Sequence, residues 1–362
     1  MRPRLWTMLA AVLLAAPAAA QAPHSSYADR LTEGDAMLRD FRFTDGERLP
    51  ELRIHYATLG TPRRDAKGEI VNAVMILHGT GGSGRQFLAP QFADELYGPG
   101  QPLDIAHYYI ILPDDIGHGR SSKPSDGMRM HFPKYDYDDM VEAERRMLVE
   151  GLGVRHLRLL MGTSMGCMHD FVWAEAHPDF ARAIMPLACL PTTLAGHNRM
   201  WREAAILGIE SDPAWAGGDY KAEPLQGLRT AETVLAIAGF APLYLQKAYP
   251  TRAAADAYIK ERIDHGVRSL DANDLIYQLD ASRNYNPWPG LERITTPLVW
   301  VNSEDDFINP PGYGIAEDAA RRMKTGRYIL IHATTDTRGH GTHTWAKFWR
   351  QELIDLLQRT EG

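Results

Sequence analysis

The chain has 362 residues, of which 44% are hydrophobic, and a formal net charge of −7 at pH 7. This composition excludes a disordered chain, and the negative charge offers no basic surface for nucleic acid, so we expect no nucleic-acid partner. With only two cysteines, Cys167 and Cys189, the chain is also not a small scaffold held together by several disulfides.

The first twenty residues have the pattern of a cleavable secretory signal. Residues 1–4 are basic, residues 5–16 are mostly apolar, and Ala18-Ala19-Ala20 has the small residues of a cleavage site. The apolar run is shorter than the roughly 20 residues that a membrane span requires. We therefore expect a signal peptide at residues 1–20, a periplasmic or secreted protein, and no stable membrane span after cleavage.

The strands are predicted from apolar runs that alternate with helical patterns. Residues 37–60 have the alternation of a β-hairpin around the turn dipeptide Asp45-Gly46. Further apolar runs lie at residues 73–77, 107–112, 156–161, 184–188, 298–301 and 328–331, and helical patterns at 138–150, after Ser164, and from about residue 344. Strands alternating with helices predict a mostly parallel central sheet covered by helices on both faces.

Residues 191–290 differ from the rest of the chain, because strand patterns disappear there and helical spacing dominates. We interpret this segment as a helical cap or lid inserted into an α/β core. The expected organisation is core residues 21–190, cap residues 191–290 and core residues 291–362. A cap of this kind excludes water and shapes a substrate pocket.

The most informative motif is Gly162-Thr163-Ser164-Met165-Gly166, which follows one predicted strand and precedes a predicted helix. In that context Gly-x-Ser-x-Gly is a nucleophile elbow, in which a sharp turn exposes the serine hydroxyl at a helix N-terminus. The glycines remove side chains that would collide in the turn. We therefore predict that Ser164 is a catalytic nucleophile rather than an ordinary loop serine.

A serine nucleophile needs a base and an acid, which follow it in the order acid then base on this fold. The acid is Asp305 or Asp306, since adjacent residues cannot both face one imidazole, and we prefer Asp306 for its spacing to Pro310. The base is His340 or His343. We prefer His340, because a loop position can reach over the sheet, whereas His343 is expected at the start of the last helix.

The Gly-rich loop His78-Gly79-Thr80-Gly81-Gly82 follows the predicted strand at 73–77. Such a loop leaves backbone N–H groups free to face a ligand. We predict that the Thr80 N–H forms half of an oxyanion hole and that His78 is a structural support.

These motifs resemble the α/β-hydrolase fold, and within it the homoserine O-acetyltransferase family. The resemblance covers residues 52–60, 132–179, Ala205-Ile206, 212–220 and 270–273. It implies Ser164, Asp306 and His340 as nucleophile, acid and base, and Thr80 and Met165 as oxyanion donors. The loops at residues 78–82 and 117–124 depart from that family and look like those of general α/β-hydrolases, and Cys167 replaces a glycine.

From these departures and the predicted export we expect a serine hydrolase that cleaves an ester or related acyl bond of a small-molecule substrate. The alternative is an acyltransferase of the homoserine O-acetyltransferase type. Neither requires a metal or a bound cofactor, and we expect none. The interpretation leaves a homodimer open. Cys167 and Cys189 are expected to be free thiols, since packing alone explains buried cysteines.

Overall fold

The computed structural model describes residues 27–361, so the predicted signal peptide at residues 1–20 lies outside the described residues. Eight strands form a single sheet in the order β1-β2-β4-β3-β5-β6-β7-β8. The strands are β1 Thr32–Arg42, β2 Arg48–Leu59, β3 Ala73–Leu77, β4 Tyr109–Pro113, β5 Leu159–Thr163, β6 Ile184–Leu187, β7 Leu298–Ser303 and β8 Gly326–Ile331. The first two strands pair antiparallel to each other and β2 antiparallel to β4, and all other pairings are parallel.

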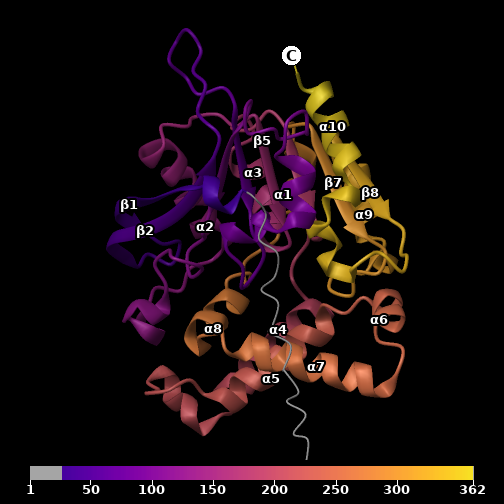
Figure 1. The fold of residues 1–362 in the computed structure, drawn as a ribbon. Helices are drawn as coiled ribbons and strands as arrows, with labels where there is room; N and C mark the ends of the chain where they lie inside the picture. The colour runs from indigo at the N-terminus through magenta and orange to yellow at the C-terminus, as the bar shows by residue number, and fades with distance from the viewer. Residues whose placement is uncertain (1–26, 362) are drawn as a thin grey trace, which may run out of the picture.

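The helices divide into two groups. The α-helices of the core are α1 Pro90–Leu96, α2 Tyr137–Arg146, α3 Met165–Ala176, α9 Ile315–Arg322 and α10 Arg350–Arg359. Those between β6 and β7 are α4 Gly196–Glu210, α5 Leu225–Ala238, α6 Pro242–Ala248, α7 Arg252–Val267 and α8 Ala272–Asp280. Figure 1 shows this second group gathered as a separate layer beyond one end of the sheet.

Alternate residues of the central strands enter two different cores. Met75 and Leu77 of β3 pack with Leu160 of β5 in the core shared with α2 and α3. Val74 and Ile76 face the opposite side and pack with residues of α1 and α10. Both faces of the sheet are therefore covered, which explains why the central strands are continuous apolar runs. The α/β architecture expected from the sequence is confirmed.

Several local boundaries differ from the sequence-based expectation. The helix expected at 138–150 begins at Tyr137, because Asp136 is its N-cap and forms a reciprocal capping box with Asp139. After α2 the chain continues as a π-helical turn over residues 147–151. The last α-helix begins at Arg350, and residues 339–344 and 346–348 form two 3₁₀ turns before it.

The prediction of free thiols is wrong, because Cys167 and Cys189 form a disulfide with their Cα atoms 5.8 Å apart. Cys167 lies in the first turn of α3, and Cys189 lies two residues beyond the end of β6. Since β6 is the parallel neighbour of β5, which leads into α3, the two cysteines meet at the same edge of the sheet. The distance between the two cysteines depends on how β5 and β6 pair, and neither cysteine's sequence neighbours reveal it.

No helix within residues 27–361 is both long and apolar enough to cross a membrane.

Candidate active site

Ser164 occupies the turn between β5 and α3 in a conformation that few residues adopt, with φ 56° and ψ −107°. The two motif glycines are required by close contacts. A Cβ on Gly162 would lie 2.2 Å from the carbonyl carbon of Gly166, and a Cβ on Gly166 would lie 2.3 Å from the Leu77 carbonyl oxygen. The strained turn therefore depends on both glycines, as expected for a nucleophile elbow.

The structure brings Ser164, Asp306 and His340 into one hydrogen-bonded chain, although they lie on three separate segments. His340 Nε2 is 2.8 Å from Ser164 Oγ, and His340 Nδ1 is 2.8 Å from Asp306 Oδ2. Asp306 follows β7, and His340 lies in the 3₁₀ turn at residues 339–344. The Asp306 side chain is fully buried and the His340 side chain is 12% exposed.

Asp306 is surrounded by hydrogen-bond donors. Its Oδ1 accepts from the backbone N–H groups of Ile308 and Asn309, and its Oδ2 accepts from Asn309 Nδ2 as well as facing His340. Burial alone would raise the pKa of Asp306, but His340 and Asn309 hold it below its ordinary value. The carboxyl group is therefore ionised and can accept a hydrogen bond from the Nδ1–H of His340.

The alternative residues Asp305 and His343 lie nearby in different roles. Asp305 Oδ2 accepts from Thr337 Oγ1 and from the Gly339 N–H, so it anchors the turn that carries His340. The His343 ring is 5.1 Å from the His340 ring, and desolvation lowers the pKa of His343 to about 3. His343 shares the 3₁₀ turn of His340 rather than starting the last helix.

Thr80 and Met165 hold two backbone N–H groups near the serine. The loop carrying Thr80 passes directly beside the elbow, since a Cβ on Gly79 would be 3.2 Å from Ser164 Cβ. The Gly166 N–H donates to the His78 carbonyl, which fixes the loop to α3. Across residues 27–361, neither the Thr80 nor the Met165 N–H donates to another protein group. Both can therefore bind an oxyanion.

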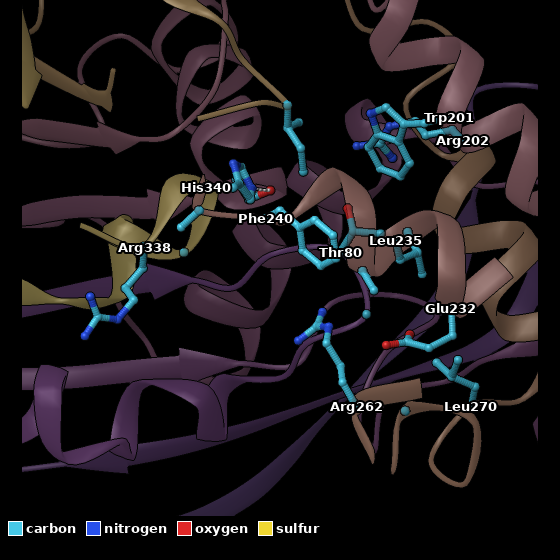
Figure 2. Close-up of a pocket in the computed structure, with 18 of the residues that line it drawn as sticks. Thr80, Trp201, Arg202, Glu232, Leu235, Phe240, Arg262, Leu270, Arg338 and His340 are labelled. Carbon is cyan, nitrogen blue, oxygen red and sulfur yellow. Dashed lines mark hydrogen bonds between the residues drawn. The ribbon is translucent and has the colours of Figure 1, made fainter. Parts of the chain in front are cut away.

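Above Ser164 lies a cavity of about 550 Å³ between the core and the helical layer. Figure 2 shows His340 on one side and Trp201 and Arg202 of α4 on the other, with Thr80 and Leu235 of α5 between them in this view. Most of the lining is apolar, but Arg202, Glu232, Arg262 and Arg338 also contribute. The helices between β6 and β7 thus form much of the wall of the pocket.

The sequence interpretation did not single out Arg202 or Glu232. Arg202 is 1% exposed, and Glu232 is 8% exposed. A signal for Arg202 was present, because it shares the helical spacing of the buried residues Ala205, Ile206 and Ile209 on α4. A charged residue on an otherwise apolar, buried face of a helix is unusual, and it indicates that the side chain has a specific polar partner.

Among the described residues, one group could hold a metal ion: Asp115, Glu144 and His169, whose nearest ligand atoms lie within 4.8 Å of one another. The group is fully buried and does not line the cavity.

Comparison with known proteins decides the family. Residues 72–333 match the model of the alpha/beta hydrolase fold. The chain belongs to the α/β-hydrolase fold family. Within that family, it is 29% identical over 334 residues to a homoserine O-acetyltransferase of Pelobacter propionicus, covering 83% of this chain and 88% of that protein.

Solved structures of the α/β-hydrolase fold align over most of this chain. The homoserine O-acetyltransferase of Bacillus anthracis aligns with a TM-score of 0.79 and 20% identity, covering 91% of this chain and 98% of that protein. An acetylester hydrolase of Corynebacterium glutamicum aligns with a TM-score of 0.79 and 20% identity, covering 90% and 96%. At these identities the structures establish the fold alone.

The comparisons therefore support an α/β-hydrolase enzyme of acyl transfer chemistry that resembles homoserine O-acetyltransferase. They favour the acyltransferase alternative over the exported ester hydrolase that the sequence led us to expect.

Proposed function

We propose that this enzyme takes an acyl group onto Ser164 and transfers it to the hydroxyl group of a small acceptor bound beneath the cap. The observation that carries the proposal is the hydrogen-bonded chain from Ser164 through His340 to Asp306, at the base of the cavity. The sequence relatives support transfer rather than hydrolysis, since those most similar include homoserine O-acetyltransferases.

The geometry supports a role for each group. Since His340 Nδ1 donates to the ionised Asp306, Nε2 is left to accept the Ser164 proton as the hydroxyl attacks an acyl carbonyl. The Thr80 and Met165 N–H groups stabilise the oxyanion that forms. His340 then gives this proton to the leaving group as its bond to the acyl carbon breaks, which yields the acyl-serine. The same imidazole takes the proton of the acceptor hydroxyl as that oxygen attacks the acyl-serine, and gives it to Ser164 Oγ as the Oγ–acyl bond breaks.

Arg202 favours an acceptor that carries a carboxylate. Its guanidinium is buried and lies 4.7 Å from the Trp201 ring, with hydrogen bonds to Asn198 Oδ1 and the Leu279 carbonyl. Within residues 27–361, the groups that act on its charge are Tyr137 and Arg199, and no carboxylate is among them. A buried unpaired cation is costly, so an anionic group of the substrate would supply the missing partner. A small hydroxy acid or hydroxy amino acid fits this requirement.

A second candidate is hydrolysis of an acyl ester by water in an exported enzyme. The buried disulfide between Cys167 and Cys189 favours it, because disulfides persist mainly in oxidising compartments. An enzyme outside the cytoplasm has no supply of acyl-CoA. The loops at residues 78–82 and 117–124, which look like those of hydrolases, point in the same direction.

One pair of assays separates the two candidates. Purified protein is given acetyl-CoA with and without homoserine, and CoA release is followed; in parallel it is given a short acyl ester in water. The proposal predicts that CoA is released faster with homoserine than without it. Ester hydrolysis without any acceptor-dependent transfer, from acetyl-CoA or from the ester to homoserine, would replace the first candidate with the second.

A further inference from the structure

A second buried polar cluster lies outside the proposed mechanism. It consists of Asp115 after β4, Glu144 on α2, and His169 and Trp173 on α3. Each of the four side chains is at most 1% exposed. Burying two carboxyl groups and an imidazole is costly unless they are hydrogen bonded, so their arrangement calls for an explanation.

Glu144 binds the nucleophile helix at two points. His169 Nδ1 is 2.7 Å from Glu144 Oε1, and Trp173 Nε1 donates to Glu144 Oε2 at 2.5 Å. At this distance the Nδ1–H of His169 is placed to donate to Glu144 Oε1. Each oxygen of Glu144 thus accepts one N–H from α3, and α2 is clamped to the helix that carries Met165 at its N-terminus.

Asp115 connects this clamp to the loop that carries Thr80. The Asp115 N–H donates to His78 Nε2 at 3.1 Å, which leaves the proton of that ring on Nδ1, where it donates to the Gly79 carbonyl at 2.8 Å. Asp115 Oδ2 lies between the two imidazoles, 3.6 Å from His78 Nε2 and 3.8 Å from His169 Nδ1. The cluster therefore reaches both segments that present oxyanion donors.

We propose that Glu144 and His169 are positioning residues for the oxyanion hole, and that their hydrogen bond fixes α3 against the Thr80 loop at the separation that the transition state requires. The inference rests on the proposed acyl-serine chemistry. Loss of this hydrogen bond should lower kcat and leave KM nearly unchanged. The bond sets the positions of the oxyanion donors, and neither residue contacts the substrate.

The magnitude follows from the sensitivity of oxyanion stabilisation to geometry. Loss of one donor costs about 10²- to 10³-fold in kcat, and a displacement of about 1 Å costs about 10²-fold. His169→Leu removes the N–H that faces Glu144 Oε1. We expect kcat per active site to fall about 10- to 100-fold, with little change in KM. His169→Gln keeps an N–H that can reach Glu144 and should remain within about threefold of the wild type.

The experiment measures turnover of an aryl acetate, normalised by titration of active Ser164, in wild type, His169→Leu and His169→Gln. A trifluoromethyl ketone, whose adduct with Ser164 places an oxyanion in the hole, should bind the leucine variant more weakly by the same factor as kcat/KM.

Trp173→Phe removes the other donor to Glu144 and provides a second test if His169→Leu does not fold. Glu175→Gln is the matched control, since Glu175 also lies on α3 and burial raises its pKa to about 7, as it does that of Glu144, but it does not contact the cluster.

Equal kcat losses in the leucine and glutamine variants, or a loss explained by fewer titratable sites, would overturn the inference. So would a fall of the same size in Glu175→Gln. If wild type itself shows no titratable Ser164, the proposed acyl-serine chemistry has failed rather than the positioning role.

Discussion

Asp306→Asn should inactivate the enzyme by reversing the tautomer of His340. The asparagine amide must place its NH₂ group at one of the two oxygen positions of Asp306. The Oδ1 position faces the fixed backbone N–H groups of Ile308 and Asn309, so the oxygen stays there. The NH₂ group then faces His340 Nδ1, which must become the acceptor and carry its proton on Nε2 instead. A protonated Nε2 cannot take the Ser164 proton.

Asp305→Asn does not require any neighbouring group to change its tautomer. Asp305 Oδ2 accepts from Thr337 Oγ1 and the Gly339 N–H, whereas Oδ1 faces only the Ser303 hydroxyl, which can rotate to accept instead of donate. An asparagine can therefore keep its oxygen at Oδ2 and satisfy every neighbour. We expect kcat to fall about 10⁴-fold for Asp306→Asn, equivalent to about 5.5 kcal/mol, and less than about 10-fold for Asp305→Asn.

The assay is turnover of a short acyl ester at neutral pH, corrected for the folded fraction by circular dichroism. Greater damage from Asp305→Asn, or more than about 1% of wild-type kcat in Asp306→Asn, would contradict the role of Asp306 as the acid. The first result would transfer the acid role to Asp305.

Further predictions concern the other residues of the site. Ser164→Ala should lose at least about 10⁴-fold in kcat and all labelling by a fluorophosphonate probe, while retaining its melting temperature; appreciable turnover in the purified variant would contradict it. His340→Ala should be inactive and His343→Ala active, and the reverse order in the same ester assay would reassign the base. Arg202→Met should lower the ratio of acceptor-dependent to water-dependent turnover at least about 10-fold for a carboxylate-bearing acceptor, and an unchanged ratio would remove Arg202 from acceptor binding. Replacing both cysteines by alanine should lower the free energy of unfolding by about 3 kcal/mol, from the closure entropy of a loop with a sequence separation of 22, and urea unfolding that matches wild type would contradict this.

The parts of the fold that the sequence predicted are those encoded over a short stretch of chain. The central strand β3 is a continuous apolar run because both faces of the sheet are covered. The elbow at Ser164 was recognisable because the strand, the glycines and the helix are adjacent in sequence. Asp306 and His340 were predicted as candidates because they follow Ser164 in the order acid then base and each lies just after a predicted strand.

Features that depend on spacing between distant segments were not predictable in the same way. The bridge from Cys167 to Cys189 requires two turns at one sheet edge to approach within bonding distance, and nothing local to either cysteine encodes that. Asp115, Glu144 and His169 come from three separate segments of the chain. In the sequence, each of them looks like an ordinary polar residue. The choice between Asp305 and Asp306 depended on which carboxylate faces the imidazole.

The disulfide has a structural consequence for the site as well as for stability. Cys189 is adjacent to Ala188, whose carbonyl accepts from Asn309 Nδ2, and the same amide donates to Asp306 Oδ2. The bridge therefore connects the first turn of the nucleophile helix to the segment that supports the acid. The bridge restrains the separation of these two segments, and His340 contacts one residue on each side, Ser164 and Asp306. The connection from Ser164 to Asp306 is therefore covalent as far as Cys189 and continues from the adjacent Ala188 through the hydrogen bonds of Asn309.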